Sequence, residues 1–498
     1  MLNVAIVGCG RIADLHAAGY RGLADARIYA VCDSDPETAA RRQAEWGAQK
    51  AYARFADLLA DPEVQALEIL TPQTLHEPMV LAAARAGKHV ALQKPMTTDL
   101  AGARRMILAM RAAGLVFRVT DNYLFYPPLV ALRELIRSGD LGAVTSLRIK
   151  FLSGGSGGWD VPASSWAWRM RERDEGRGLQ TFDHGHHLWA TAIHLLGPVE
   201  KVSAWIDSVD GVVDCPATVM WKYAGRPCYG LCEYVHAPDV RVPSLYYAND
   251  EAFEVSGSRG VAVVRRCTGN IDEGPPLSLF TSGGWRHFPD IPSDWQEGFT
   301  GATRNFIDAI NGRDAPRLTG EDAWEVLRLS LAIQKSARRR REVWLEEMDS
   351  PVPALARWRR RRAERPGVGA PAGRERSAGG LFGGAGRHAG QAGDLTRALV
   401  GRFDASRAEG WSTVIGLRLL ADGGAPETLF GLHVAEGRAS LTEGALPDDA
   451  VLTISLPAGA WAAILLKKQR LETVFLRGKL KAEGRVEDGL KLRSAFGL

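Results

Sequence analysis

The sequence predicts an α/β chain in three folded parts: a parallel sheet flanked by helices, an α+β domain with a large, mainly antiparallel sheet, and a smaller linked α+β module. Three observations predict this. Strand-like and helical patterns alternate over residues 1–120, and β-rich runs cluster over residues 121–347. The composition then changes to Arg, Gly, Ala and Pro over residues 348–393, before ordered patterns return at 394–498.

In the first part, short apolar runs are typical of strands buried on both faces. We expect these strands at residues 2–7, 26–32, 66–70, 89–93 and 115–120. Helices are expected from residue 12, from Asp35-Pro36, over 78–86, and from a cap at Thr97 or Thr98 to residue 113. Strictly alternating strands and helices imply right-handed crossovers and a parallel sheet.

The second part has a different pattern, in which strands follow one another instead of alternating with helices. Strands are expected at 144–152, 201–207, 217–224, 228–235, 251–256 and 261–265, and helices at 128–138, 180–196, 300–311 and 320–335. Clustered strands of this kind indicate a mainly antiparallel sheet with helices on one face.

Residues 348–393 are expected to be a flexible basic linker, because so few apolar side chains cannot offset the entropy of ordering. The stretch 351–392 holds nine arginines against two glutamates, while the whole chain has a net charge of only +4. The folded parts are therefore weakly acidic, so we expect no nucleic-acid partner. Six cysteines in 498 residues are too few for a disulfide framework, no secretory signal precedes the first strand, and Pro457 and Gly459 interrupt the uncharged run 450–466. We expect a cytoplasmic protein with no membrane span.

A glycine loop follows the first strand directly. Gly8, Gly10 and Ala13 have the G-x-G-x-x-[GA] spacing, which allows a tight turn, close approach of a pyrophosphate and close packing of the next helix. Asp33 ends the second strand, where a carboxylate accepts hydrogen bonds from ribose hydroxyls and repels a 2′-phosphate. The sequence thus predicts a Rossmann-type domain that binds NAD in preference to NADP. The alternative is a glycine turn without a nucleotide.

Two further groups of residues suit alcohol chemistry. Lys94 follows the fourth strand, at the carboxyl edge of the sheet, where it can hydrogen-bond a substrate hydroxyl. Asp183 and His187 are spaced i, i+4, which predicts a carboxylate beside an imidazole that acts as general base. Considered singly, a solvated lysine and a helix with satisfied histidines are the simpler explanations. His184, His186 and His187 point to different helix faces, so we expect no metal site.

Taken in order, these motifs resemble the glucose–fructose oxidoreductase / inositol dehydrogenase / MocA (Gfo/Idh/MocA) family over residues 1–347. They are GCGRIA (8–13), the strand ending in Asp33, TPQTLH (71–76), QKP (93–95), Asn122, LIRSGDLG (135–142) and D-x-G-x-H (183–187). The resemblance implies that Lys94, Asp183 and His187 form the catalytic group. It implies NAD contacts from Gly8, Gly10, Arg11, Ile12, Asp33, Thr71, Pro72, His76, Gln93, Lys94 and Asn122.

Two positions depart from the family pattern. Gln93 stands where the family usually has Glu, which removes a negative charge near Lys94 and should make that lysine easier to deprotonate. Ala190 stands where an Asp is frequent, which removes a substrate or structural contact. Indoles and guanidinium groups upstream of Asp183 suit stacking on sugar rings and binding of hydroxyls, although core packing explains them equally well. The candidate substrate residues are Trp159, Trp166, Trp168, Arg169 and His184.

Residues 395–498 resemble the sterol carrier protein type-2 fold, through strands followed by an apolar helix at 458–468, a helix near 473 and the run GKLKAEG (478–484). The resemblance implies an apolar tunnel for a hydrophobic ligand, and the alternative is a closed packing or dimerising module.

These features predict an NAD-dependent oxidoreductase that transfers a hydride between nicotinamide and a secondary hydroxyl of a sugar, cyclitol, glycoside or related polyol. Two alternatives remain. One is a redox-neutral glycoside-processing enzyme with tightly bound NAD, and the other is a hydrophobic-ligand carrier with a nucleotide-sensing dehydrogenase domain. As partners we expect the polyol or sugar, a hydrophobic ligand in the C-terminal module, and a second copy of the chain on the sheet of the second part.

Overall fold

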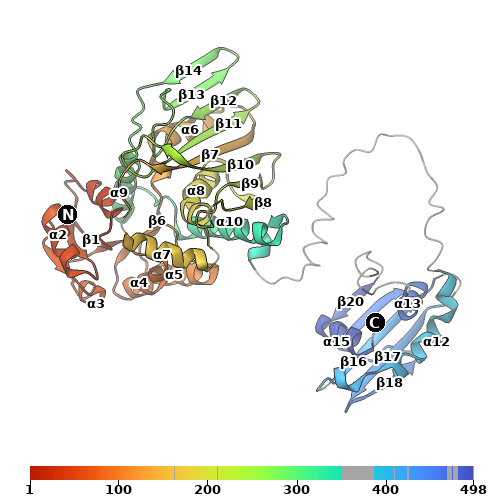
Figure 1. The fold of residues 1–498 in the computed structure, drawn as a ribbon. Helices are drawn as coiled ribbons and strands as arrows, with labels where there is room; N and C mark the ends of the chain where they lie inside the picture. The colour runs from red at the N-terminus through yellow and green to blue at the C-terminus, as the bar shows by residue number, and fades with distance from the viewer. Residues whose placement is uncertain are drawn as a thin grey trace. The chain divides into compact units, whose positions relative to one another are not determined.

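Two separate units make up the chain, Met1–Arg365 and Pro366–Leu498 (Figure 1). The computed structural model describes residues 1–161, 163–175, 177–209, 211–349, 386–408, 410–422, 425–467, 471, 474 and 480–496. Each unit has its own sheet system and hydrophobic core.

The first unit begins with a six-stranded sheet in the order β3-β2-β1-β4-β5-β6, and every pair in it is parallel. All six residues of β1 are buried, which explains why five of the six are apolar; the sixth, Asn3, has its side chain hydrogen-bonded to the carbonyl oxygen of Glu63 and to Arg27. The order reverses between β1 and β4, and this is where a doubly wound sheet leaves a crevice for a ligand. The strands are β1 (Leu2–Val7), β2 (Ala26–Cys32), β3 (Lys50–Tyr52), β4 (Ala66–Ile69), β5 (His89–Gln93) and β6 (Phe117–Thr120).

Helices connect these strands, and their ends follow ordinary capping chemistry. Asp35 caps α2 by accepting hydrogen bonds from the backbone N–H groups of Glu37 and Thr38. The cap of α5 is Asp99, not the expected Thr97 or Thr98, because Asp99 is the extended residue directly before the helix and its carboxylate accepts from the N–H of Gly102. The helices are α1 (Ala13–Ala18), α2 (Pro36–Trp46), α3 (Phe55–Leu59), α4 (His76–Arg85) and α5 (Leu100–Ala112).

A nine-stranded sheet in the order β14-β13-β12-β11-β7-β10-β9-β8-β15 forms the rest of the first unit. Its strands are β7 (Val144–Ser156), β8 (Val199–Ile206), β9 (Ala217–Tyr223), β10 (Tyr229–Arg241), β11 (Asn249–Gly257), β12 (Gly260–Val264), β13 (Leu277–Thr281), β14 (Gly284–Phe288) and β15 (Val343–Trp344). Among the described strand pairs of this sheet, only β7 and β10 run parallel, so the expected mainly antiparallel sheet is confirmed.

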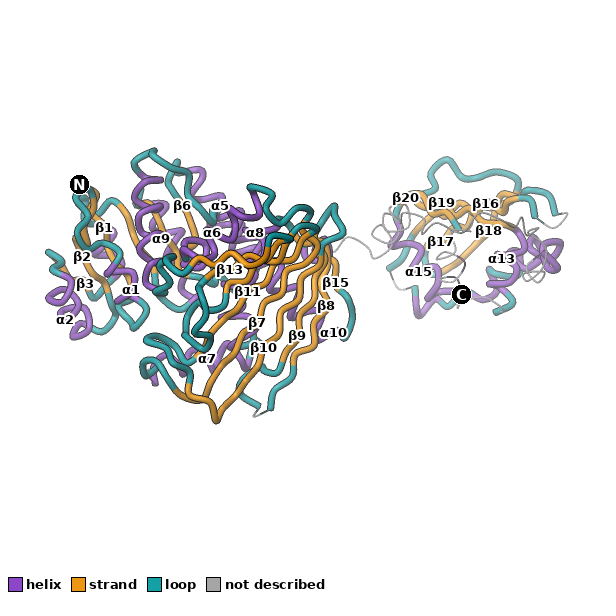
Figure 2. The backbone as a smooth tube through the Cα atoms, turned by 90° about the horizontal axis from the view of Figure 1, so that it is seen from above, coloured by secondary structure: helices purple, strands orange, loops and turns teal. Residues whose placement is uncertain are grey.

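One face of this sheet is covered by helices and the other is open (Figure 2). On the covered face, α6 packs on β12 and β13, and α10 packs on β8. The open face carries exposed large side chains: Trp205, Met220, Tyr229, Phe280 and Trp285. The helices of this region are α6 (Pro127–Arg137), α7 (Ala163–Asp174), α8 (Gly185–Leu196), α9 (Gln296–Ile310) and α10 (Gly320–Arg339).

The second unit holds a five-stranded sheet in the order β18-β17-β16-β19-β20. Every residue of α13 is buried, so this helix is enclosed by the core on all sides. The strands are β16 (Thr413–Leu420), β17 (Thr428–Ala435), β18 (Arg438–Glu443), β19 (Leu452–Pro457) and β20 (Lys481–Gly484), and the helices are α12 (Ala392–Arg397), α13 (Ala458–Leu465) and α15 (Val486–Phe496).

The expected linker over 348–393 lies mostly outside the described residues, as does the centre of the helix expected near 473. The end of that linker is ordered: Gly386–Gln391 form a 3-10 turn, and Ala389 and Ala392 are buried in the second core. In the described part of the chain, no helix has the length and apolarity that crossing a membrane requires.

Candidate active site

The glycine loop lies where the strand order reverses. Gly8 has a φ of +87°, and a Cβ there would lie 3.0 Å from the carbonyl carbon of Leu70 at the end of β4, so a larger residue would strain the turn and press on this strand end. A Cβ on Gly10 would meet nothing within 4 Å, which leaves its backbone open. Arg11, next along, places its guanidinium carbon 4.4 Å above the ring of Trp159. Ile12 then leads into α1.

Asp33 lies beside this loop at the end of β2. Its Oδ2 accepts a hydrogen bond of 2.8 Å from the N–H of Cys9, and its Oδ1 accepts one of 3.0 Å from the N–H of Asp35. The carboxylate is thereby oriented by the backbone and remains partly exposed. A carboxylate held in this way has further lone pairs for the hydroxyls of an adenosine ribose.

The loops after β4 and β5 are tied together by His76, which is fully buried. Its Nε2 lies 2.7 Å from the carbonyl oxygen of Thr71, and its Nδ1 lies 3.0 Å from that of Pro95. Burial lowers the pKa of His76 below its ordinary value. His76 therefore fixes the backbone at Thr71 relative to that at Pro95.

Gln93 connects the β5 loop to a buried polar chain. Its side-chain N–H donates to Nε2 of His16 at 3.1 Å, and its Oε1 accepts from the N–H of Lys94 at 2.8 Å. His16 in turn donates from Nδ1 to Glu68 at 2.5 Å, and Tyr20 donates to the same carboxylate at 2.6 Å. Burial alone would raise the pKa of Glu68, but His16 outweighs it and holds that pKa below its ordinary value. Gln93 is uncharged and donates to Nε2 of His16, so Nδ1 of His16 carries the ring proton that faces Glu68.

Lys94 reaches across to the second sheet region and binds Asp183. Its Nζ lies 2.9 Å from the carbonyl oxygen and 3.0 Å from Oδ1 of Asp183. Arg169 approaches the other carboxylate oxygen at 3.6 Å. Burial alone would raise the pKa of Asp183, but Lys94 and Arg169 outweigh it and hold the pKa well below its usual range.

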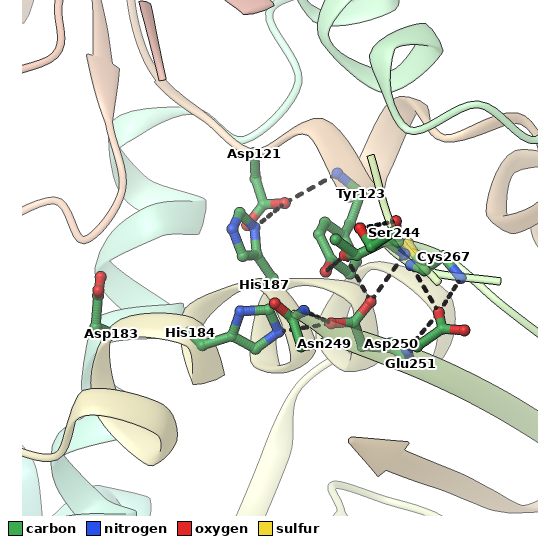
Figure 3. A network of polar contacts seen from close by, with 12 residues as sticks. Asp121, Tyr123, Asp183, His184, His187, Ser244, Asn249, Asp250, Glu251 and Cys267 are labelled. Carbon is green, nitrogen blue, oxygen red and sulfur yellow. Dashed lines mark hydrogen bonds and ion pairs between the residues drawn. The ribbon is translucent and has the colours of Figure 1, made fainter. Parts of the chain in front are cut away.

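His187 is paired with Asp121, which contradicts the expectation that Asp183 orients it (Figure 3). Its Nδ1 lies 2.9 Å from Oδ1 of Asp121, and both side chains are buried. The physical reason is charge pairing: the carboxylate of Asp183 is held by Lys94 and Arg169, and Asp121, directly after β6, is the carboxylate that reaches Nδ1 of His187. Asp183 itself lies in a π-helical turn over Leu179–His184, in which its N–H donates to the carbonyl of Gly178, five residues earlier.

Asp121 and Asn122 directly follow β6, the last strand of the parallel sheet. Asp121 also accepts a hydrogen bond of 3.1 Å from the N–H of Tyr123, whose ring stacks on His187 with a centroid distance of 4.4 Å. Within the described part of the chain, neither polar atom of the buried Asn122 amide has a hydrogen-bond partner. Such an orphaned amide beside the crevice fits a residue that holds a cofactor.

The candidate substrate residues fall into different environments. Trp159 packs edge-on against Tyr246 and Tyr247, with centroid distances of 5.6 and 5.2 Å. Trp168 lies under the guanidinium group of Arg169. The side chain of Trp166 lies outside the described part of α7.

His184 contacts a carboxylate of its own: its Nε2 lies 3.0 Å from Oε1 of Glu251. Sequence reasoning missed both Asp121 and Glu251. The position of Asp121 directly after a strand of the parallel sheet was a usable signal, whereas Glu251 lies within a strand pattern that offered none. In the described residues, no group of three or more His, Cys, Asp or Glu side chains is placed to hold a metal ion.

A glycine loop at the reversal point of a parallel sheet, with a lysine and a carboxylate-bound histidine beside it, defines a nicotinamide-dependent dehydrogenase. Residues 2–121 match the profile of the oxidoreductase family with an NAD-binding Rossmann fold, and residues 129–263 match the GFO/IDH/MocA C-terminal domain. The chain belongs to the Gfo/Idh/MocA oxidoreductase family and is an NAD-dependent oxidoreductase acting on CH–OH groups. Residues 401–497 match the SCP-2 sterol transfer family.

Among curated proteins, the chain is similar to D-apiose dehydrogenase of Paraburkholderia graminis, with 25% identity over 70% of this chain and 92% of that enzyme. It is also similar to myo-inositol 2-dehydrogenase of Thermotoga maritima, with 26% identity over 70% of this chain and 99% of that enzyme. Among solved structures, levoglucosan dehydrogenase in complex with NADH and levoglucosan superposes with a TM-score of 0.60 at 22% identity, covering 69% of this chain and 99% of that one.

Proposed function

We propose that this chain oxidises a secondary hydroxyl of a sugar, cyclitol, glycoside or related polyol, or reduces the corresponding ketone. The observation that carries the proposal is the pair of contacts at the carboxyl ends of β5 and β6: the part-buried Lys94–Asp183 and the buried His187–Asp121. These groups supply a hydrogen-bond donor and a base beside the glycine loop, which is what removal of an alcohol proton requires. The named relatives act on an apiose, an inositol and levoglucosan.

His187 is the proposed general base. Because the Asp121 carboxylate accepts from Nδ1–H, the lone pair of the neutral ring is on Nε2, where it can take the hydroxyl proton. Burial lowers the pKa of His187 more than Asp121 raises it, so the ring is unprotonated near neutral pH. Asp121 orients the ring and stabilises the imidazolium that forms, which makes it the positioning residue in place of Asp183.

Lys94 is the proposed donor to the substrate oxygen. Its ammonium group is held by the carbonyl and the carboxylate of Asp183, and its third donor position can face an alcohol or ketone oxygen. Bound NAD would supply the acceptor for the hydride on the carbon that carries this oxygen. Arg169 and the rings of Trp159 and Trp168 are proposed to contact the rest of the substrate.

The proposed cofactor contacts follow from the placement of the loops. Gly8, Gly10, Arg11 and Ile12 would hold the pyrophosphate and Asp33 the adenosine ribose. The residues after β4, β5 and β6 would surround the nicotinamide half, and they are Thr71, Pro72, Gln93, Lys94 and Asn122, with His76 supporting them.

The test is a panel of sugars, cyclitols and glycosides incubated with the full chain and NAD, with NADH absorbance as readout. We expect continuous NADH formation with at least one polyol, and a loss of at least about a hundredfold in turnover for Lys94→Ala and for His187→Ala with NAD affinity retained. Product formation without NADH release would instead support the redox-neutral alternative. No conversion of any member would contradict the proposal.

Two finer partner proposals accompany this function. The exposed apolar side chains on the open face of the nine-stranded sheet support pairing with a second copy of the chain, because patches of this kind mark interaction surfaces. Trp205→Glu combined with Met220→Glu should then lower the molecular mass found by sedimentation.

The SCP-2 match and the enclosed α13 support a hydrophobic ligand in the second unit. This is tested by mass spectrometry of the lipids that copurify with the protein.

A further inference from the structure

The candidate active site contains two histidine–carboxylate pairs, and the function proposed above uses only one. The rings of His184 and His187 lie next to each other, with a centroid distance of 5.4 Å and a T-shaped arrangement (Figure 3). His187 is held at Nδ1 by Asp121, while His184 is held at Nε2 by Glu251. In the described part of the chain, no hydrogen bond is made by Nε2 of His187 or by Nδ1 of His184, and Nε2 of His184 has only this ion-pair contact with Glu251.

Glu251 is built into the sheet as a fixed anion. It lies in β11 with a side chain that is 0% exposed, and Asn249 donates to its Oε1 at 2.6 Å. The N–H and hydroxyl of Thr268 donate to its Oε2 at 3.1 and 2.8 Å. Burial alone would raise the pKa of Glu251, but His184, Thr268 and Tyr123 together outweigh it and hold the pKa below its ordinary value. Glu251 therefore presents a fixed negative charge to Nε2 of His184, 3.0 Å away.

His184 is placed to use its second nitrogen on a ligand. One face of its ring packs on Phe151 at a centroid distance of 4.5 Å, yet 17% of the side chain stays exposed. Glu251 lies on the opposite side of the ring from Asp183, the partner of Lys94 (Figure 3). A purely structural counter-ion for Glu251 would need neither this exposure nor the position beside His187.

We propose that the His184–Glu251 pair binds the hydroxyl next to the one that is oxidised, so that the substrate class is a vicinal diol within a polyol or sugar ring. The inference rests on the proposed function, because it takes His187 as the base for the reacting hydroxyl. Two adjacent imidazoles, each with one nitrogen fixed by a buried carboxylate, match two hydroxyl oxygens on neighbouring carbons. His184 then acts as a specificity residue, and Glu251 acts through it as a positioning residue.

The experiment compares a polyol that the chain oxidises with its two analogues that lack the hydroxyl on either neighbouring carbon. For the unaltered chain, loss of one of these hydroxyls should lower kcat/KM about 10- to 100-fold, the effect of losing one hydrogen bond to a charged or polarised group. His184→Leu should lower kcat/KM for the intact polyol by a similar factor and leave that of the deoxy analogue unchanged. Glu251→Gln should give the same pattern more weakly, because an amide at residue 251 can still contact His184.

The neighbouring histidine provides a matched control. His186 is buried, and its Nδ1 contacts the carbonyl oxygen of Phe182 at 2.5 Å instead of a carboxylate. His186→Asn should therefore keep the discrimination between the intact and deoxy polyols. NAD affinity and thermal unfolding, measured for every variant, separate misfolded proteins from altered ones.

The outcomes distinguish this inference from the proposed function. Equal losses for the intact and deoxy polyols in His184→Leu, or no discrimination by the unaltered chain, would overturn the second-hydroxyl site. Calorimetry of the same compounds with the NADH-loaded chain needs no turnover. If the chain oxidises none of these compounds but binds them in a way that requires both His184 and the neighbouring hydroxyl, the proposed function is contradicted and the second-hydroxyl site is retained.

Discussion

Replacing Asp121 with asparagine tests which carboxylate serves the catalytic histidine. The change is nearly isosteric, and the oxygen of the introduced amide should remain at the position of Oδ1, because that atom also accepts the N–H of Tyr123 at 3.1 Å. An oxygen at this position keeps the proton on Nδ1 of His187 and the lone pair on Nε2. The substitution therefore removes charge while the ring orientation is retained.

The magnitude follows from the kind of hydrogen bond that is lost. A bond of 2.9 Å between a buried imidazole and a buried carboxylate becomes a neutral one, and this difference is about 1–1.5 kcal/mol. The pKa of His187 should fall further, and turnover should fall about tenfold because the imidazolium is less well stabilised. If the amide N–H faced the ring instead, the base itself would be lost, at a cost of up to about 10⁴-fold.

The assay is the pH dependence of kcat/KM for the best polyol, measured for the unaltered chain, Asp121→Asn and Asp183→Asn. Because burial lowers the pKa of His187, activity of the unaltered chain should be lost on acidification only below the ordinary range of histidine. Asp121→Asn should move this acid limb to lower pH, whereas Asp183→Asn should reduce activity through Lys94 and leave the limb in place. A limb that moves with Asp183→Asn and not with Asp121→Asn would refute the assignment.

Four further predictions concern the rest of the chain. Asp33→Ala should weaken NAD binding by about 1–3 kcal/mol in calorimetry, and tighter binding of NADP than of NAD by the unaltered chain would contradict the assigned preference. Gln93→Met leaves the Nε2 of His16 without its donor and should lower the free energy of unfolding by about 1–3 kcal/mol; an unchanged melting temperature would exclude a stabilising role for this polar chain. Burial lowers the pKa of His186 to about 4, so the folded state binds fewer protons than the unfolded state at any pH between that value and the ordinary pKa of about 6.5. Stability should fall as the pH drops through this window, and His186→Leu should flatten the dependence measured by denaturant titration. Limited trypsin treatment should cut first within 351–376, whose composition predicts a linker, and first cuts elsewhere would contradict that prediction.

Local patterns predicted the elements that are determined by local chemistry. β1, β2 and β5 have the expected bounds because strands buried on both faces must be short apolar runs. The glycine loop could be predicted equally well, because its glycine spacing is required by the backbone conformation of the loop itself. The edge strands β3 and β14 were missed, because they are short and their mostly exposed or half-buried side chains carry no such pattern.

Sequence by itself determined which residue types reach the site: a lysine after β5 and an imidazole at the start of α8. Only the tertiary structure decided their partners. Lys94 and Asp183 are separated by 89 residues, and His187 and Asp121 by 66. The i, i+4 spacing predicted a contact between Asp183 and His187, but Asp183 pairs with Lys94 and Arg169, and His187 pairs with Asp121. Charge pairing depends on distances of a few ångströms between distant segments, and these distances are set by the packing of two sheets and not by any local repeat.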